Sequence, residues 1–203
     1  MISFESVCLR HQGKDIFNNL DLTILEKENV LIQGKSGIGK TTLFKLLLGF
    51  GTADSGSILF NGYKIGKTHI NEIREQIFYL SQDIDLRHES VGNLLDEILK
   101  VNLIQHNNSN KIEKILNFLE LDIKLLEQNI KDLSGGERQR VGLLIGFLLD
   151  RPVWLLDEPT SALDDAMKRK VSKFILGQDK TIVIISHDDV WKQHKEIKIK
   201  RLR

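Results

Sequence analysis

The segment from Gly34 to Thr41, with the sequence GKSGIGKT, has the residue types and spacing of a loop that binds polyphosphate. It fits the pattern G-x-x-x-x-G-K-[ST], in which glycines bring a row of backbone N–H groups close to phosphate oxygens. An apolar stretch at 30–32 precedes the loop and a helical pattern follows it, so a helix N-terminus adds partial positive charge. In this pattern Lys40 reaches the β- and γ-phosphates, and the Thr41 hydroxyl binds Mg²⁺. The segment predicts a nucleotide site.

Two adjacent carboxylates, Asp157 and Glu158, end an apolar stretch at 153–156 that indicates a buried strand. Successive side chains of a strand point in different directions, so the two acids can serve different partners. We expect Asp157 to hold Mg²⁺ through the hydration shell of the ion, and Glu158 to act as the general base toward an attacking water. Phosphoryl transfer depends mainly on positioning and charge neutralisation, which these groups supply.

The elements that must position these groups alternate between short apolar strands and helices. Strands are expected at residues 2–9, 20–24, 29–33, 57–60, 77–80, 153–156 and 181–185. Helices are expected at 41–50, from 90 to about 126 around a polar loop at 105–110, at 135–149 and at 166–176. This alternation predicts an α/β fold with a mostly parallel sheet flanked by helices, and the phosphate loop makes it a P-loop NTPase core. An N-terminal antiparallel β part and an inserted α-helical subdomain, about 83–150, complete one domain over 1–203.

The composition places the chain among soluble globular proteins. Of its 203 residues, 41% are hydrophobic and 28% are charged, and the net charge of +1 gives no support for a nucleic-acid partner. A single cysteine, Cys8, excludes an internal disulfide. No secretory signal and no run of about 20 apolar residues is present, so another chain would supply any membrane part.

A third motif, Leu133-Ser134-Gly135-Gly136-Glu137, opens the helical pattern at 135–149. Its serine and glycines give a second helix N-terminus suited to an anion. On its own the motif indicates only an N-capped helix followed by basic residues. The order of phosphate loop, Gln82, this signature motif, acidic strand end and His187 resembles the ABC family of ATPases across nearly the whole chain.

The resemblance implies roles for further residues. Gln82 would contact Mg²⁺ and the attacking water, and His187 would lie at the γ-phosphate and join Lys40 and Glu158 as a catalytic residue. The segment 161–164 would cross between two subunits. The expected metal residues are Thr41, Gln82 and Asp157. The expected nucleotide-binding residues are His11, Gly34, Lys35, Ser36, Gly37, Ile38, Gly39, Lys40, Thr41, Thr42, Gln82, Ser134, Gly135, Gly136, Glu137 and Asp164.

The resemblance also implies a head-to-tail dimer, with each ATP between the phosphate loop of one subunit and the signature motif of the other. This agrees with a physical requirement, because one phosphate loop leaves the γ-phosphate open to solvent. A second helix N-terminus would close the site and strengthen its electrostatics by excluding water. Each motif occurs once in the chain, so a second ABC ATPase subunit is expected, with a homodimer preferred.

Three features depart from the usual family pattern or lie outside it. Glu137 stands where many members have glutamine, which is a frequent variation. His11 stands where an aromatic residue usually stacks on adenine; imidazole is smaller and can become charged, so adenine contact and a plain surface histidine both stay open. The basic C-terminal segment would suit anionic lipid, although a solvated terminus is the preferred interpretation. Its basic residues are Lys192, Lys195, Lys198, Lys200, Arg201 and Arg203.

The predicted function is an ATP-hydrolysing motor subunit of an ABC transporter, peripheral on the cytoplasmic face of the cell membrane and bound to a separate permease. The alternative is a soluble ABC ATPase that acts on DNA or ribosomes. The interval from Gln82 to Ser134 is too short for the long coiled coil of the DNA-repair type, and the chain holds one ATPase unit, whereas the translation type usually holds two. Segments 73–79 and 129–134 resemble small bacterial ABC ATPases that pair with a separate permease. The cargo is set mainly by the membrane subunit.

Overall fold

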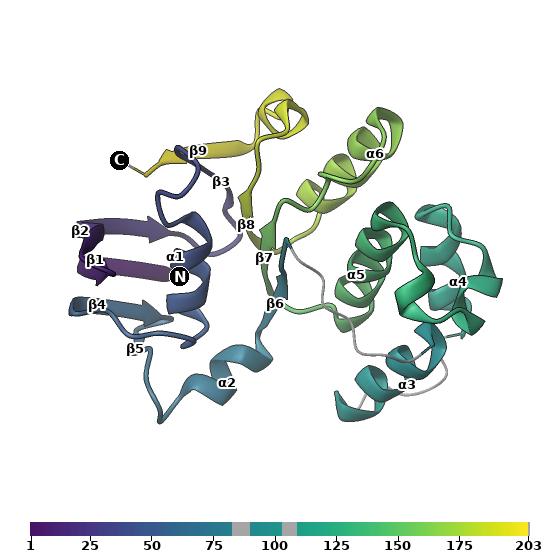
Figure 1. The fold of residues 1–203 in the computed structure, drawn as a ribbon, viewed down its shortest axis with the longest axis horizontal. Helices are drawn as coiled ribbons and strands as arrows, with labels where there is room; N and C mark the ends of the chain where they lie inside the picture. Colours follow the sequence, from purple (N-terminus) through teal and green to yellow (C-terminus); the bar gives the residue numbers. More distant parts are fainter. Residues whose placement is uncertain (83–89, 103–108, 203) are drawn as a thin grey trace.

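The fold, seen in a computed structural model that describes residues 1–82, 90–102 and 109–202, contains two sheets and a helical region (Figure 1). The first sheet is antiparallel, in the order β2-β1-β4-β5. Its strands are β1 (Ile2–His11), β2 (Lys14–Ile24), β4 (Ser55–Phe60) and β5 (Tyr63–Lys64). Its β4–β5 turn is Asn61-Gly62, with φ of 51° and 83°. Two successive positive φ angles are typical of the tight hairpin turn that this pair favours.

The second sheet is parallel throughout the described residues, in the order β6-β7-β8-β3-β9. Its strands are β3 (Asn29–Gln33), β6 (Ile77–Leu80), β7 (Val153–Asp157), β8 (Thr181–Ile185) and β9 (Ile197–Arg201). Alternate side chains of one strand enter different cores. In β3, Val30 and Ile32 pack with the antiparallel sheet and α1 (Lys40–Leu47), whereas Leu31 packs with the helical region. Two buried faces explain why these strands are apolar without alternation.

The helical region lies on the opposite side of the parallel sheet from α1 (Figure 1). It contains α3 (Val91–Val101), α4 (Ser109–Phe118), η1 (Ile123–Glu127), η2 (Ile130–Asp132) and α5 (Gly135–Leu149). The remaining elements are α2 (Ile70–Glu75), α6 (Asp165–Leu176) and η3 (Asp189–Gln193). Helix α5 approaches β6 so closely that a Cβ on Gly146 would lie 2.2 Å from the Phe78 ring. This contact fixes α5, the helix that begins at the signature motif, against the sheet.

The predicted fold class is confirmed: a mostly parallel sheet with flanking helices, an N-terminal antiparallel part and helices inserted between β6 and β7. The first part of the predicted helical subdomain, 83–89, and most of the predicted polar loop, 105–108, lie outside the described residues. Helix α2 was not predicted from the sequence, because its six residues are too few to show a period.

Residues 197–201 form β9, which the sequence did not predict, and pair with β3 from Asn29↔Ile197 to Gln33↔Arg201. Lys198 and Arg201 in this strand are exposed, and whether the basic segment meets solvent or lipid stays open. The strand completes the edge of the sheet beside β3, and Lys198 makes an ion pair of 3.0 Å with the largely buried Glu28. Only Ile197 and Ile199 are apolar in this segment, and its other three residues are basic, so the sequence pattern does not indicate a strand. No helix in the described part of the chain is both long and apolar enough to cross a membrane.

Candidate functional site

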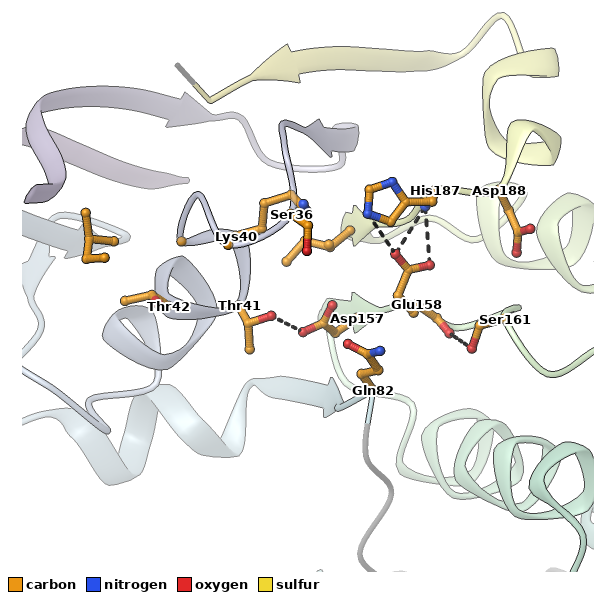
Figure 2. A pocket seen from close by; sticks show the side chains of 14 residues that line it. Ser36, Lys40, Thr41, Thr42, Gln82, Asp157, Glu158, Ser161, His187 and Asp188 are labelled. Atoms are coloured by element: carbon orange, nitrogen blue, oxygen red, sulfur yellow. Dashed lines mark hydrogen bonds and ion pairs between the residues drawn. The ribbon is translucent and has the colours of Figure 1, made fainter. Parts of the chain in front are cut away.

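One edge of the parallel sheet gathers most of the predicted site residues. The strands run in one direction, so the segments that follow β3, β6, β7 and β8 meet at their carboxyl ends, the usual place for a ligand in such sheets. A cavity of about 540 Å³ lies there (Figure 2). The predicted residues that line it are Ser36, Gly37, Gly39, Lys40, Thr41, Thr42, Gln82, Asp157, Glu158 and His187. Ser161, the first residue of the predicted segment 161–164, also lines it, together with Ile16, Ile185 and Asp188, which the sequence did not predict as site residues.

The phosphate loop connects β3 to α1 and needs glycine for its path. Gly37 and Gly39 have φ of 76° and 100°, a conformation that side-chain-bearing residues rarely adopt. A Cβ on Gly39 would also lie 2.6 Å from Ile16, so β2 closes over the loop at this point. Gly39 is the N-cap of α1 and brings no side-chain acceptor, which leaves the first-turn N–H groups facing an anion site.

Lys40 holds its ammonium at the phosphate loop. Its Nζ donates to the carbonyl oxygens of Gly34 and Lys35, at 3.0 and 3.1 Å, and the residue is only 9% exposed. Largely buried lysines are rare unless their charge is compensated. The ammonium therefore lies preorganised beside the loop N–H groups, where phosphate oxygens would complete its shell.

Asp157 and Thr41 form the oxygen pair expected for a metal. The Thr41 hydroxyl donates to Asp157 Oδ2 at 2.7 Å, and Asp157 is 2% exposed (Figure 2). Burial, aided by the neighbouring charge of Glu158, raises the pKa of Asp157, while the Thr41 hydrogen bond and Lys40 oppose that rise. Mg²⁺ prefers one or two carboxylates together with substrate phosphates rather than a cage of protein ligands. The buried carboxylate, the hydroxyl and the Gln82 amide at the cavity fit that requirement.

The raised pKa of Asp157 gives a pH-dependent prediction for Asp157→Asn in the nucleotide-free protein. A carboxyl whose folded pKa is raised costs stability above that pKa, and the cost disappears as the pH falls below the ordinary value of 3.8. Asparagine keeps an acceptor for Thr41 and removes the charge. We expect a higher Tm at neutral pH, by about 2–4 °C for each kcal/mol of cost removed, and a smaller gain in acid. Thermal unfolding from pH 4.5 to 8 measures both; an unchanged or lower Tm at neutral pH contradicts the prediction.

Glu158 has a carboxylate fixed by hydrogen bonds and a backbone in an unusual conformation. The carboxylate accepts hydrogen bonds from Ser186 Oγ at 3.0 Å and from the His187 N–H at 3.1 and 3.3 Å. The His187 ring nitrogen Nε2 lies 3.8 Å from Glu158 Oε1 (Figure 2). Glu158 also has φ of 51°, a left-handed conformation that costs about 1–3 kcal/mol in a residue other than glycine. Such strain occurs at functional sites, where surrounding contacts maintain it.

The segment after His187 is anchored by Asp188. Its carboxylate accepts from Thr160 Oγ1 at 2.6 Å and from Lys168 Nζ at 2.6 Å, and Trp191 Nε1 donates to Thr160 at 3.2 Å. Although burial opposes ionisation, the hydrogen bonds from Lys168 and Thr160 hold the pKa of Asp188 below its ordinary value. This network ties the turn after β7 to the turn after β8 and so fixes the two segments that carry Glu158 and His187.

The signature motif forms the N-terminus of α5 and does not line this cavity. Ser134 Oγ accepts from the Glu137 N–H at 3.2 Å, and Glu137 Oε2 accepts from the Ser134 N–H at 2.9 Å, which is a capping box. Hydrogen bonds from Ser134 lower the pKa of Glu137. Gly135 has open space at its Cβ position, and a Cβ on Gly136 would lie 2.9 Å from the Ala162 carbonyl oxygen.

The other predicted residues outside the cavity have structural positions of their own. Asp164 caps α6 by accepting from the Met167 N–H at 2.9 Å, and that bond lowers the pKa of Asp164. His11 lies exposed at the end of β1, paired with Lys14, whereas Ile16 of β2 lines the cavity. Gly34, Lys35 and Ile38 belong to the phosphate loop but do not line the cavity. Adenine contact by His11 stays a prediction.

The family model described as ABC transporter matches residues 17–161. The chain is 30% identical over 202 residues to the probable ABC transporter ATP-binding protein p29 of Mycoplasma pneumoniae, with 93% of this chain and 82% of that protein covered. It is also 30% identical over 199 residues to the ATP-dependent lipid A-core flippase of Haemophilus influenzae, with 92% of this chain and 33% of that protein covered. The chain thus spans about one third of the length of the curated flippases it matches.

Solved structures share the fold. The dimeric structure of MJ0796, a bacterial ABC transporter cassette, has a TM-score of 0.85 with this chain at 23% identity. The superposition covers 99% of this chain and 94% of that one.

Proposed function

The chain belongs to the ABC transporter family, which confirms the resemblance drawn from its motifs, and we propose that it is the ATP-binding and ATP-hydrolysing motor of an ABC transporter. The observation that carries the proposal is the convergence of Lys40, Thr41, Asp157, Glu158 and His187 on one cavity. These residues come from three separate parts of the chain and supply a cation, metal ligands, a base and a γ-phosphate contact.

The proposed chemistry assigns one task to each group. Lys40 and the loop N–H groups neutralise the phosphate charge, and Mg²⁺ held by Thr41, Gln82 and Asp157 would add to that neutralisation. Glu158 orients the attacking water and accepts its proton, because its carboxylate is already fixed by Ser186 and the His187 N–H. His187, whose side chain is 66% exposed, would contact the γ-phosphate from the open side of the cavity.

We further propose that catalysis requires a second ABC ATPase subunit, with a second copy of this chain as the simplest case. The signature residues Ser134 to Glu137 lie outside the cavity of their own chain. A head-to-tail arrangement would bring the α5 N-terminus of one subunit to the open cavity of the other, with His11 at the adenine end. The dimeric state of MJ0796, the solved structure described above, supports this arrangement by analogy of fold.

The proposed membrane partner is a separate permease that binds the helical region, about 83–150, near Gln82, and holds the motor on the inner face of the cell membrane. The names of the relatives support transport: one is a probable ABC transporter ATP-binding protein, and another is a lipid flippase. They give no support to action on DNA or ribosomes. Gln82 supports coupling, because it follows β6 at the cavity edge and precedes the inserted helices in the sequence.

Purification from native membranes tests the transport proposal. Affinity-tagged chain, solubilised with a mild detergent from its own organism, is expected to carry an integral membrane protein in a fixed ratio. Glu158→Gln with Mg-ATP serves as a second sample that favours the closed state. Recovery with ribosomes or DNA, or with no membrane protein in either sample, contradicts the proposal, whereas ATPase activity of the purified chain tests the enzymatic part separately.

A further inference from the structure

Gln139 joins the signature helix to the turn that carries Glu158. It lies on α5 and is 5% exposed. Its Nε2 donates to the Glu158 carbonyl oxygen at 2.6 Å and lies 3.3 Å from Ser161 Oγ, and its Oε1 accepts from the Ala162 N–H at 2.8 Å. One buried amide therefore uses both of its ends on the turn after β7. Buried amides with both ends satisfied by backbone groups fix the geometry of the groups they join.

The backbone of Glu158 needs such a contact. Its φ of 51° is unfavourable for a residue with a side chain, so neighbouring groups must maintain it. The Glu158 N–H donates to the Ile185 carbonyl oxygen at 2.8 Å, which fixes one side of the residue. Its carbonyl oxygen accepts from Gln139 and, at 3.1 Å, from Ser161 Oγ. Gln139 provides the shorter of these two side-chain bonds, and it comes from a different element.

The same helix begins at the signature motif. The first turn of α5 lies against the turn after β7, because a Cβ on Gly136 would be 2.9 Å from the Ala162 carbonyl oxygen. The α5 N-terminus and Gln139 belong to one helix, and Gln139 donates to the Glu158 carbonyl oxygen, so a displacement of this helix would reach the backbone of Glu158. In the proposed dimer, the α5 N-terminus contacts the ATP of the partner, whereas Glu158 acts on the ATP of its own chain.

We propose that Gln139 is a positioning residue that holds Glu158 in its catalytic orientation and couples it to the signature helix of the same chain. The inference rests on the proposed function of Glu158 as the base. It assigns to Gln139 an effect on turnover rather than on ATP binding, because its bonds go to the turn of residues 158–162 and Gln139 itself does not line the cavity.

Steady-state ATPase kinetics of Gln139→Met test the proposal. Methionine keeps the length and removes both hydrogen-bonding ends, so we expect kcat to fall at least about tenfold while KM for ATP stays within about twofold. Gln178→Met is the matched control, because the Gln178 amide donates to the Phe174 carbonyl oxygen at 3.1 Å on α6, away from the cavity. In a Glu158→Gln background, adding Gln139→Met is expected to leave ATP-dependent dimerisation intact.

Three results overturn the inference. The first is a folded Gln139→Met with kcat within twofold of the unmodified chain. The second is a variant whose activity falls because KM for ATP rises. The third is loss of dimerisation in the Glu158→Gln background, which assigns Gln139 to the signature contact. If Gln139→Met does not fold, Gln139→Glu decides by the same criteria, since it keeps the acceptor for Ala162 and loses the donor to Glu158. An unmodified chain without ATPase activity contradicts the proposed function instead.

Discussion

Replacement of Glu158 by glutamine is expected to lower kcat for ATP hydrolysis by about two to four orders of magnitude, the usual contribution of a general base. The substitution keeps the side-chain length and an acceptor for Ser186 and the His187 N–H, so the turn after β7 is preserved. It removes the group that takes the proton of the attacking water. ATP binding depends on the phosphate loop instead, and we expect the Kd for Mg-ATP to change by less than about threefold, an energy difference below ~0.7 kcal/mol.

Single-turnover hydrolysis and nucleotide titration separate these two effects, with Glu113→Gln on the exposed face of α4 as a control. Light scattering adds a third measurement. The monomer has a mass of 23.3 kDa, and Mg-ATP is expected to shift Glu158→Gln to about twice that mass because the closed state cannot reopen by hydrolysis. Turnover at the unmodified rate would show that Glu158 is not the base. A monomer that binds ATP would indicate that closure needs the membrane subunit or a different ATPase.

Replacement of Lys40 by alanine is expected to raise the Kd for Mg-ATP by about 100-fold or more. Hydrogen bonds from a charged donor contribute about 1.5–3 kcal/mol each, and each 1.4 kcal/mol is a factor of ten. Lys40 would bond two phosphates, and its ammonium is already held at the loop by the Gly34 and Lys35 carbonyl oxygens. Little conformational freedom is therefore lost on binding, which strengthens its contribution.

Titration with a fluorescent ATP analogue measures this loss, and Lys64→Ala on the exposed strand β5 is the control for a removed lysine. Circular dichroism establishes that the variant is folded. Within the described residues, the ammonium donates only to two carbonyl oxygens, which water can reach after the substitution, so we expect Tm to change little in the absence of nucleotide. An unchanged Kd in a folded variant would contradict the assignment of residues 34–41 as the phosphate site.

The site could be predicted from the sequence where chemistry depends on neighbours along the chain. The phosphate loop fixes Lys40 and Thr41 by spacing alone, and the strand end fixes Asp157 beside Glu158. His187 needed the family resemblance, because one histidine after a strand carries no signal of its own. All of these residues line the cavity.

The residues that the sequence did not predict depend on tertiary contacts. Ile16 reaches the cavity because β2 passes over the phosphate loop at Gly39. No sequence pattern around Ile16 indicates this contact. Asp188 and Gln139 act through bonds to residues 28 and 19 positions away. In the same way, β9 exists because β3 offers an unpaired edge, which a short segment of alternating isoleucine and basic residues cannot reveal.

The pairing of β3 has a consequence for biosynthesis. The strand that leads into the phosphate loop lies between β8 and β9, so Asn29 pairs with Ile182 on one side and with Ile197 on the other. A ribosome that adds about 5–20 residues per second would hold residues 29–33 without either neighbour for roughly 8–31 s. Pairings between segments so distant in the sequence also form slowly. During that interval the nascent chain exposes an apolar strand that lacks both of its sheet partners, so aggregation during synthesis is a hazard that chaperone binding would reduce.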